Sequence, residues 1–216
     1  MGLREANTER RRQRILAATR ELIASDGVHG WSMRKVADAA DVSVPTLYNL
    51  FGSKDEIRAA LVGGFFDELD RSLGDGGPPD QPIERVLAFV TAGVDTIVAR
   101  AATTRPALLA QEQGGGGEHR TTPIAVERQR AAIQAAMDAG YLRADLRADL
   151  LAAQAYDGFH RAAILWARGT LDASGFRSRA RYAVCVCLLA VATDASRPDL
   201  LGACRELERD LDPLAP

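Results

Sequence analysis

The 26 residues from 31 to 56, WSMRKVADAADVSVPTLYNLFGSKDE, constrain the fold more than any other part of this 216-residue chain. They contain two short runs in which apolar residues recur at helical spacing, separated by three residues that break the pattern. Two short amphipathic helices joined in this way are typical of a helix-turn-helix, whose second helix enters the major groove of DNA. Two ordinary surface helices of an all-α core are the alternative interpretation. The apolar positions are Met33, Val36, Ala37 and Ala40, then Leu47, Leu50 and Phe51.

Residues that favour helix starts stand before or within each run. Ser32 and Ser43 can each accept a hydrogen bond from a backbone N–H one turn into the helix that follows. Pro45 falls in a first turn, where proline is tolerated because the N–H groups there have no partner within the helix. Ser53 and Glu56 have the S-x-x-E spacing of a capping box, which predicts a rigid start for a further helix. The free N–H groups and positive dipole end of such a start favour a phosphate.

Residues 42–57, VSVPTLYNLFGSKDEI, closely resemble the signature V-S-x-x-x-L-Y-x-H-F-x-S-K-E-E-L of the TetR family of bacterial transcriptional regulators. The aromatic pair, the Ser-Lys and the acidic pair all fall at the expected offsets. The resemblance extends over about residues 10–60. Two positions depart from the family pattern: Leu50 replaces a frequent histidine, and Pro45 replaces a glycine or another small residue. These departures concern the contacts to DNA and leave the implied fold unchanged.

The resemblance implies DNA-binding roles for residues in and near the second helix of the motif. Tyr48 matches a tyrosine that commonly donates its hydroxyl to a phosphate, and Lys54 matches a lysine that also meets the DNA backbone. Thr46 and Asn49 lie where the family often reads bases, and Arg34 could reach a phosphate or a base. The predicted DNA-binding residues are Arg34, Ser43, Val44, Thr46, Tyr48, Asn49 and Lys54.

Charge supports DNA binding only locally. The formal net charge of −2 argues against a general nucleic-acid coat protein. Residues 1–60 carry ten Lys/Arg against eight Asp/Glu, whereas the remainder carries 17 against 21. Four arginines precede the motif and are predicted to strengthen salt-sensitive attraction to phosphates, although a solvated helix face is the alternative interpretation. They are Arg10, Arg11, Arg12 and Arg14.

The chain as a whole is predicted to be all-α, with about nine to ten helices and no sheet. A first helix should end at Asp26-Gly27, and Trp31 should anchor a small core beneath the motif. Further helices are expected at about 53–73, 82–104, 106–113, 122–140, 145–169, 175–194 and 198–210. We therefore expect a three-helix helix-turn-helix domain at residues 1–55. A larger helical domain for ligand binding and dimerisation is expected at 56–216, with residues 74–80 as a linker.

Several other classes of protein are disfavoured. His29, His119 and His160 fall at no metal-ligand or catalytic-triad spacing, so we expect no metal, no cofactor and no enzymatic activity. The glycine run at 114–117 lacks the G-K-[ST] of a phosphate-binding loop and is predicted to be a surface loop. No segment has the apolar length of a membrane span, and no secretion signal is present. Three cysteines are expected to be buried free thiols, so a cytoplasmic protein is predicted. They are Cys185, Cys187 and Cys204.

In the resembled family, the second domain forms a homodimer and encloses a small-molecule pocket. The resemblance therefore implies a repressor that binds double-stranded operator DNA as a homodimer and is released by a small-molecule effector. The alternatives are an activator, or a ligand-independent DNA-organising or interaction protein. Large side chains that could line the pocket, or simply form core, are Phe65, Phe66, Phe89, Tyr156, Phe159, His160 and Trp166.

Overall fold

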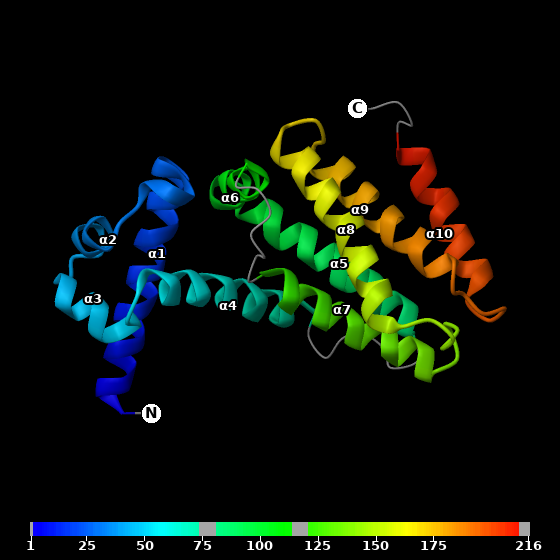
Figure 1. The fold of residues 1–216 in the computed structure, drawn as a ribbon, viewed down its shortest axis with the longest axis horizontal. Helices are drawn as coiled ribbons and strands as arrows, with labels where there is room; N and C mark the ends of the chain where they lie inside the picture. Colours follow the sequence, from blue (N-terminus) through cyan, green and yellow to red (C-terminus); the bar gives the residue numbers. More distant parts are fainter. Residues whose placement is uncertain (1, 74–80, 114–120, 212–216) are drawn as a thin grey trace. The chain divides into compact units, whose positions relative to one another are not determined.

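The computed structural model describes residues 2–73, 81–113 and 121–211, and these residues form ten helices (Figure 1). No strand occurs within these ranges, where the only β pairing is an isolated bridge between Leu142 and Ala192. The predicted all-α fold class is confirmed. The helices are α1 Leu3–Gly30, α2 Met33–Ala39, α3 Val44–Phe51, α4 Lys54–Leu73, α5 Pro82–Ala99, α6 Ala101–Gln113, α7 Thr121–Asp138, α8 Ala148–Ala167, α9 Ala173–Leu189 and α10 Arg197–Asp210.

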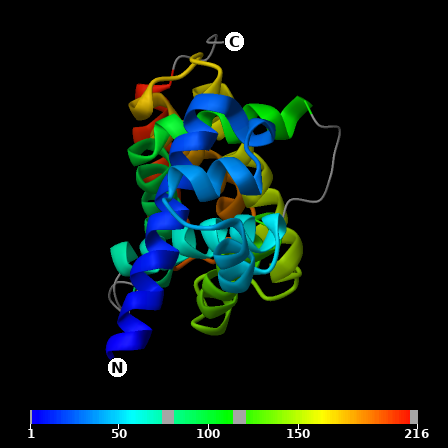
Figure 2. The same ribbon diagram turned by 90° about the vertical axis from the view of Figure 1, so that its left-hand side faces the viewer.

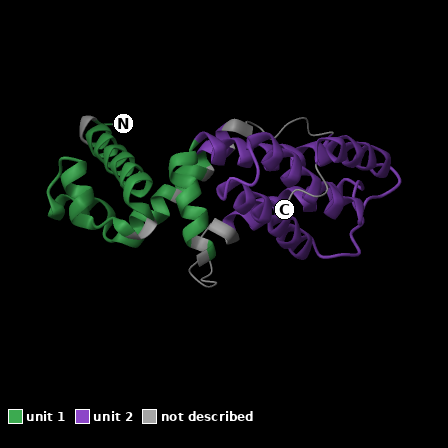
Figure 3. Cartoon of the chain, turned by 90° about the horizontal axis from the view of Figure 1, so that it is seen from above, with its two compact units in different colours: residues 1–67, 100–115 green, residues 68–99, 116–216 purple. Residues whose placement is uncertain are grey.

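The chain divides into two compact units (Figure 3). The first unit comprises Met1–Asp67 and Arg100–Gly115, so that α6 packs against α1 within it. The second unit comprises Glu68–Ala99 and Gly116–Pro216. The expected functional boundary between residues 55 and 56 lies inside the first unit and stays a prediction.

Helices α1, α2 and α3, which face the viewer in Figure 2, contribute their buried residues to one apolar core in the first unit. Trp31 is only 2% exposed in this core, which confirms that it anchors the motif, and Leu47 of α3 is fully buried. Ile57 at the start of α4 is buried in the same cluster. The other fully or largely buried members are Ile15, Leu16, Ala18, Val36, Ala37, Ala40 and Phe51.

Local signals place the helix ends of the motif as predicted. The Ser32 hydroxyl accepts a hydrogen bond from the Lys35 N–H at 3.3 Å, and the Ser43 hydroxyl accepts one from the Thr46 N–H at 3.2 Å. Gly52 ends α3 with a φ of 81°, a left-handed conformation that glycine adopts without strain. The expected end of the first helix at Gly27 is a kink instead, because α1 resumes beyond it and reaches Gly30.

The second unit is a helical bundle in which α8 packs against α7 and α9, and α9 also packs against α5 and α10. Phe176 of α9 is fully buried, with its ring centroid 5.7 Å from that of Phe159 and 5.6 Å from that of Trp166. Gly158 of α8 meets Ala183 of α9 so closely that a Cβ at Gly158 would lie 2.6 Å from the Ala183 Cβ. These two helices can approach because both residues are small.

Two expected helix boundaries are wrong. The helix predicted over 82–104 ends at Ala99, and α6 starts at Ala101, so Pro106 lies inside α6 rather than at its start. The Arg100 carbonyl accepts hydrogen bonds from the N–H groups of Thr103 and Thr104 and so opens the new helix. No proline or glycine marks this break, which is why the sequence pattern did not reveal it.

Among the described residues, no single helix combines the length and apolarity of a membrane span, although the bent pair Pro82–Ala99 and Ala101–Ala110 does so together.

The three cysteines are free thiols, with Cys185 and Cys204 buried and Cys187 half-buried. Burial raises the pKa of the Cys185 thiol to about 12. The raised pKa keeps this thiol protonated near neutral pH.

We expect the native Cys185 thiol to react with Ellman's reagent at pH 8 at least about a hundredfold more slowly than in urea-unfolded protein, because the thiolate is the reacting species. Rates should be compared between a Cys187→Ser, Cys204→Ser variant and the same variant in denaturant. Equal rates in the two conditions would show that Cys185 is accessible and ionised in the native fold.

Candidate nucleic-acid interface

Helix α3 presents two chemically different sides. Leu47 and Phe51 are buried in the core of the first unit, and Leu50 packs partly against it. On the outer side, Asn49 is exposed and 48% of Tyr48 is exposed. A phenol and an amide on an exposed helix face can donate to phosphates and base edges, so α3 carries the groups expected of a recognition helix.

The predicted residues at the start of α3 are partly committed to the fold. The Ser43 and Thr46 hydroxyl oxygens lie 2.7 Å apart, so both belong to the cap of this helix. Val44 packs against the core of the first unit. Arg34, by contrast, is exposed in the first turn of α2. Direct contacts of these residues with DNA stay predictions.

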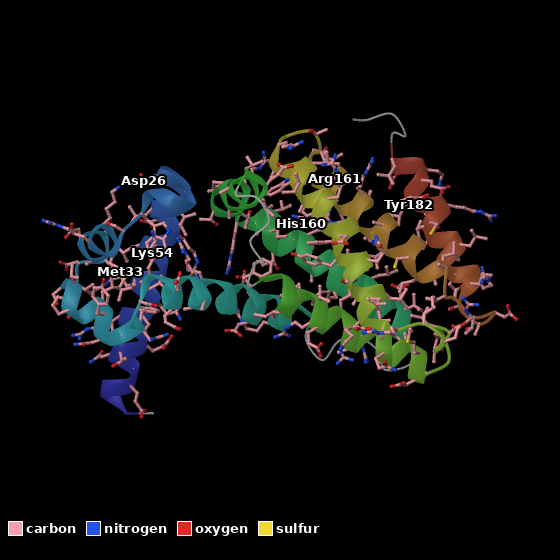
Figure 4. The ribbon with its side chains drawn as sticks, in the orientation of Figure 1. Asp26, Met33, Lys54, His160, Arg161 and Tyr182 are labelled. Carbon is pink, nitrogen blue, oxygen red and sulfur yellow. The ribbon has the colours of Figure 1, made fainter. Side chains whose placement is uncertain are left out.

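Lys54, labelled in Figure 4, has a structural role that its position in the motif did not reveal. Its ammonium donates a hydrogen bond of 2.7 Å to the Trp31 carbonyl and lies 4.4 Å from the centroid of the Trp31 ring. Burial, together with the nearby Arg58, lowers the pKa of Lys54. Because an ammonium has three N–H donors, the bond to Trp31 leaves donors for a phosphate, and that contact stays a prediction.

Two arginines of α1 donate hydrogen bonds to backbone carbonyls in and after the turn between α2 and α3. Asp41 adopts a φ of 50°, a left-handed conformation that Asp tolerates better than most residues. Arg14 donates a hydrogen bond of 3.4 Å to the Asp41 carbonyl. Arg12 donates one of 2.5 Å to the Leu50 carbonyl near the end of α3, and its guanidinium lies 4.3 Å from the Phe51 ring centroid.

These contacts change the interpretation of the arginine cluster. Arg12 and Arg14 were expected to attract phosphates, but both brace carbonyl groups of the helix-turn-helix. Arg10 and Arg11 are exposed, as a solvated or phosphate-facing side chain would be. Arg12 lies 38 residues before its partner Leu50, so helical spacing could not have revealed the contact.

An Arg12→Met variant is expected to lower the free energy of unfolding by about 1–2 kcal/mol, since it loses a charged hydrogen bond and a cation–π contact while keeping the apolar stem. Urea denaturation followed by circular dichroism measures this change. Arg11→Met is the matched control, because Arg11 is exposed on the same helix and should change stability by less than about 0.5 kcal/mol. Equal stabilities of the two variants would contradict the bracing role.

An ion pair joins the end of α1 to α2. Lys35 Nζ lies 2.6 Å from a carboxylate oxygen of Asp26 and donates a further hydrogen bond of 3.0 Å to the Gly30 carbonyl. The hydrogen bond from Lys35 lowers the pKa of the Asp26 carboxyl.

Among the residues that the structure describes, no cluster of three or more His, Cys, Asp or Glu could hold a metal ion.

The predicted pocket residues fall in both units. Phe65 and Phe66 belong to α4 in the first unit, and the Phe66 side chain lies outside the described part of the structure. The second unit contains the remaining five, which are Phe89, Tyr156, Phe159, His160 and Trp166.

Within the second unit, three aromatic side chains of α8 lie together, whereas Trp166 of the same helix packs elsewhere. The Tyr156 ring stacks on Phe159 and His160, with centroid distances of 6.3 and 5.9 Å. Phe159 also faces α5, where a Cβ at Gly93 would lie 3.5 Å from its ring. Trp166 is 2% exposed and packs against Phe176, as a core residue does. Their part in binding a ligand stays a prediction.

Residues 15–61 match the profile of the bacterial regulatory proteins of the tetR family. The chain is 38% identical over 81 residues to the HTH-type transcriptional repressor KstR of Rhodococcus jostii (strain RHA1), covering 38% of this chain and 38% of that protein. It is 40% identical over 68 residues to the HTH-type transcriptional activator FasR of Mycolicibacterium smegmatis (strain ATCC 700084 / mc(2)155), covering 32% and 31%. The matched segment thus spans less than two fifths of the length of either relative.

The fold has a close counterpart among solved structures. A TetR-family transcriptional regulator from Rhodococcus sp. superposes with a TM-score of 0.68 at 22% sequence identity. The superposition covers 82% of this chain and 98% of the other. At this level of identity the likeness concerns the fold, and it extends well beyond the segment that the sequence comparisons match.

Proposed function

Since this protein belongs to the TetR family of bacterial regulatory proteins, we propose that it is a DNA-binding transcriptional repressor. The observation that carries the proposal is the outer face of α3, where Tyr48 and Asn49 are exposed while Leu47 and Phe51 hold the helix on its core. Similarity to a repressor over 81 residues supports repression. Such a protein acts in the cytoplasm, where it meets the chromosome. We also propose that the protein has no catalytic activity.

The protein acts as a homodimer formed through α8 and α9. The support is apolar side chains exposed on this pair of helices, with 60% of Leu150 and 44% of Val186 accessible. A twofold axis between two copies would place two α3 helices on half-sites about 34–36 Å apart. Light scattering should therefore give about twice the chain mass of 23.2 kDa.

A small-molecule effector releases the repressor. A ligand that binds one arrangement of the dimer better than another changes DNA affinity by the same coupling free energy, typically about 1–3 kcal/mol, or about 5–150-fold. The aromatic stack of Tyr156, Phe159 and His160 supports a site in the second unit.

A mobility-shift titration on the DNA upstream of its own gene tests the proposed function. We expect a discrete complex at about 150 mM salt, at concentrations at least about a hundredfold below those needed for an unrelated fragment of equal length. Equal affinity for the two fragments would mean that the protein is not a sequence-specific regulator.

Activation is the second candidate, because the chain is also similar to an activator over 68 residues. In vitro transcription from the bound promoter separates the two. A fall in transcript upon adding the protein supports repression, and a rise supports activation.

A further inference from the structure

Helix α7 carries a buried side-chain amide nitrogen without a hydrogen-bond partner among the described residues. Gln129 is 3% exposed, and its Nε2 has no hydrogen-bond partner among the described residues. Ile133 and Ala136 follow on the same face of the helix, at one and two further turns, and both are fully buried. The face of α7 that holds this amide is therefore the one that packs into the second unit.

The buried residues of the two helices that pack against α7 are mostly apolar. α7 packs against α5 and α8, whose buried residues include Val90 and Val94 on α5, and Ala152 and Ala155 on α8. An amide N–H that is removed from water without a partner destabilises the folded state, which is why nearly all buried polar groups in proteins are paired. Leucine or methionine at position 129 would fill similar volume without this cost. An acceptor from outside the chain would remove this cost.

Aromatic side chains lie on the neighbouring helix. α8 packs against α7, and Tyr156 follows directly after the fully buried Ala155 on α8. Tyr156, Phe159 and His160 occupy this part of α8, where His160 is labelled in Figure 4. Gly93 on α5 leaves room for the Phe159 ring. The bundle thus places flat apolar surfaces and an unpaired donor on adjacent helices.

We propose that Gln129 is the polar anchor of an effector site in the second unit, and that its ligand is an uncharged, largely apolar molecule with a carbonyl oxygen. The carbonyl accepts from Gln129 Nε2, while the apolar part packs on the aromatic rings. A carboxylate is disfavoured because a neutral amide does not compensate a buried charge. The regulatory consequence rests on the proposed function, but ligand binding itself is measured without DNA.

Two matched probes test this chemistry in the full-length protein. Acetophenone and ethylbenzene have the same ring and carbon chain and differ in the carbonyl oxygen. Thermal unfolding is recorded for the wild type, for Gln129→Met, and for Gln134→Met. Gln134 is the control because it lies on the same helix but is partly exposed and donates to Asp138 at 2.9 Å.

The proposal makes two linked predictions. Gln129→Met should unfold about 2 °C or more above the wild type, because it removes an unpaired buried donor. At 1 mM, acetophenone should raise Tm more than ethylbenzene does in the wild type and in Gln134→Met, and this difference should disappear in Gln129→Met. A Gln129→Met protein with a lowered Tm would show that the amide is satisfied within the fold. Equal shifts from the two probes in the wild type, including no shift from either, would also overturn the proposal.

Failure here is distinguishable from failure of the proposed function. If the wild type discriminates between the probes but does not bind its upstream DNA, the role of Gln129 is supported and the proposed regulatory function is rejected. If the wild type binds this DNA specifically but does not discriminate between the probes, the regulatory function is supported and the role of Gln129 is rejected.

Discussion

A Tyr48→Phe variant is expected to bind operator DNA at least about tenfold more weakly than the wild type. The substitution removes only a hydroxyl, and a hydrogen bond to a charged phosphate contributes about 1.5–3 kcal/mol. Tyr48 is 48% exposed on the outer face of α3, so the loss should affect binding rather than folding. Each operator complex of a dimer would lose two such bonds.

Fluorescence anisotropy with labelled operator DNA at about 150 mM salt measures this loss. Tyr182→Phe is the matched control, because it removes the same group from the second unit, where the Tyr182 hydroxyl donates to Glu208 at 2.8 Å (labelled in Figure 4). Its affinity for DNA should equal that of the wild type. The slope of affinity against salt should be unchanged in Tyr48→Phe, since no charge is removed. Wild-type affinity in Tyr48→Phe would reject this contact.

Phe176→Ala is expected to lower the free energy of unfolding of the second unit by about 3–5 kcal/mol. Phe176 is fully buried between the rings of Phe159 and Trp166, so its removal leaves a cavity lined by aromatic side chains that cannot close it. A loss of this size is a large fraction of the about 5–15 kcal/mol that stabilises a typical domain.

Guanidinium denaturation, followed by circular dichroism and by light scattering, measures this effect. The proposed dimer should dissociate at lower denaturant concentrations, because a weakened bundle would also lose the proposed interface of α8 and α9. Ile124→Ala is the control: it truncates an apolar side chain of α7 that is 40% exposed, and should change stability by less than about 1 kcal/mol. A Phe176→Ala protein as stable as this control would show that the aromatic cluster is not a packed core.

The helix-turn-helix was predictable because its signals act over a few residues. The serine caps of α2 and α3 bind N–H groups three residues away, and Gly52 ends α3 through its own φ. The capping serine before α4 behaves in the same way, since the Ser53 hydroxyl accepts from the Glu56 N–H at 3.1 Å. Interactions of this range depend only on residues that are neighbours along the chain, so they can be predicted from the sequence.

The roles of individual charged residues were not predictable in the same way. Lys54 and Arg12 both matched expectations for phosphate contact, yet each binds a backbone carbonyl, 23 and 38 residues away along the chain. A cation near a DNA-binding helix fits both roles equally well in a sequence. The two roles are distinguished by whether the fold places a carbonyl group without a helical partner near that cation. This is not visible in the sequence.

The amino-acid order by itself determined the helical class, the helix-turn-helix and the family, because each rests on short periodicities and on a contiguous signature. Tertiary structure alone decided the break at Arg100, the bracing by Arg12 and the unpaired amide of Gln129. These three depend on which distant helices become neighbours. Whether a polar atom is satisfied is set by the groups that packing brings within about 3 Å of it, and helical spacing along one segment does not specify them.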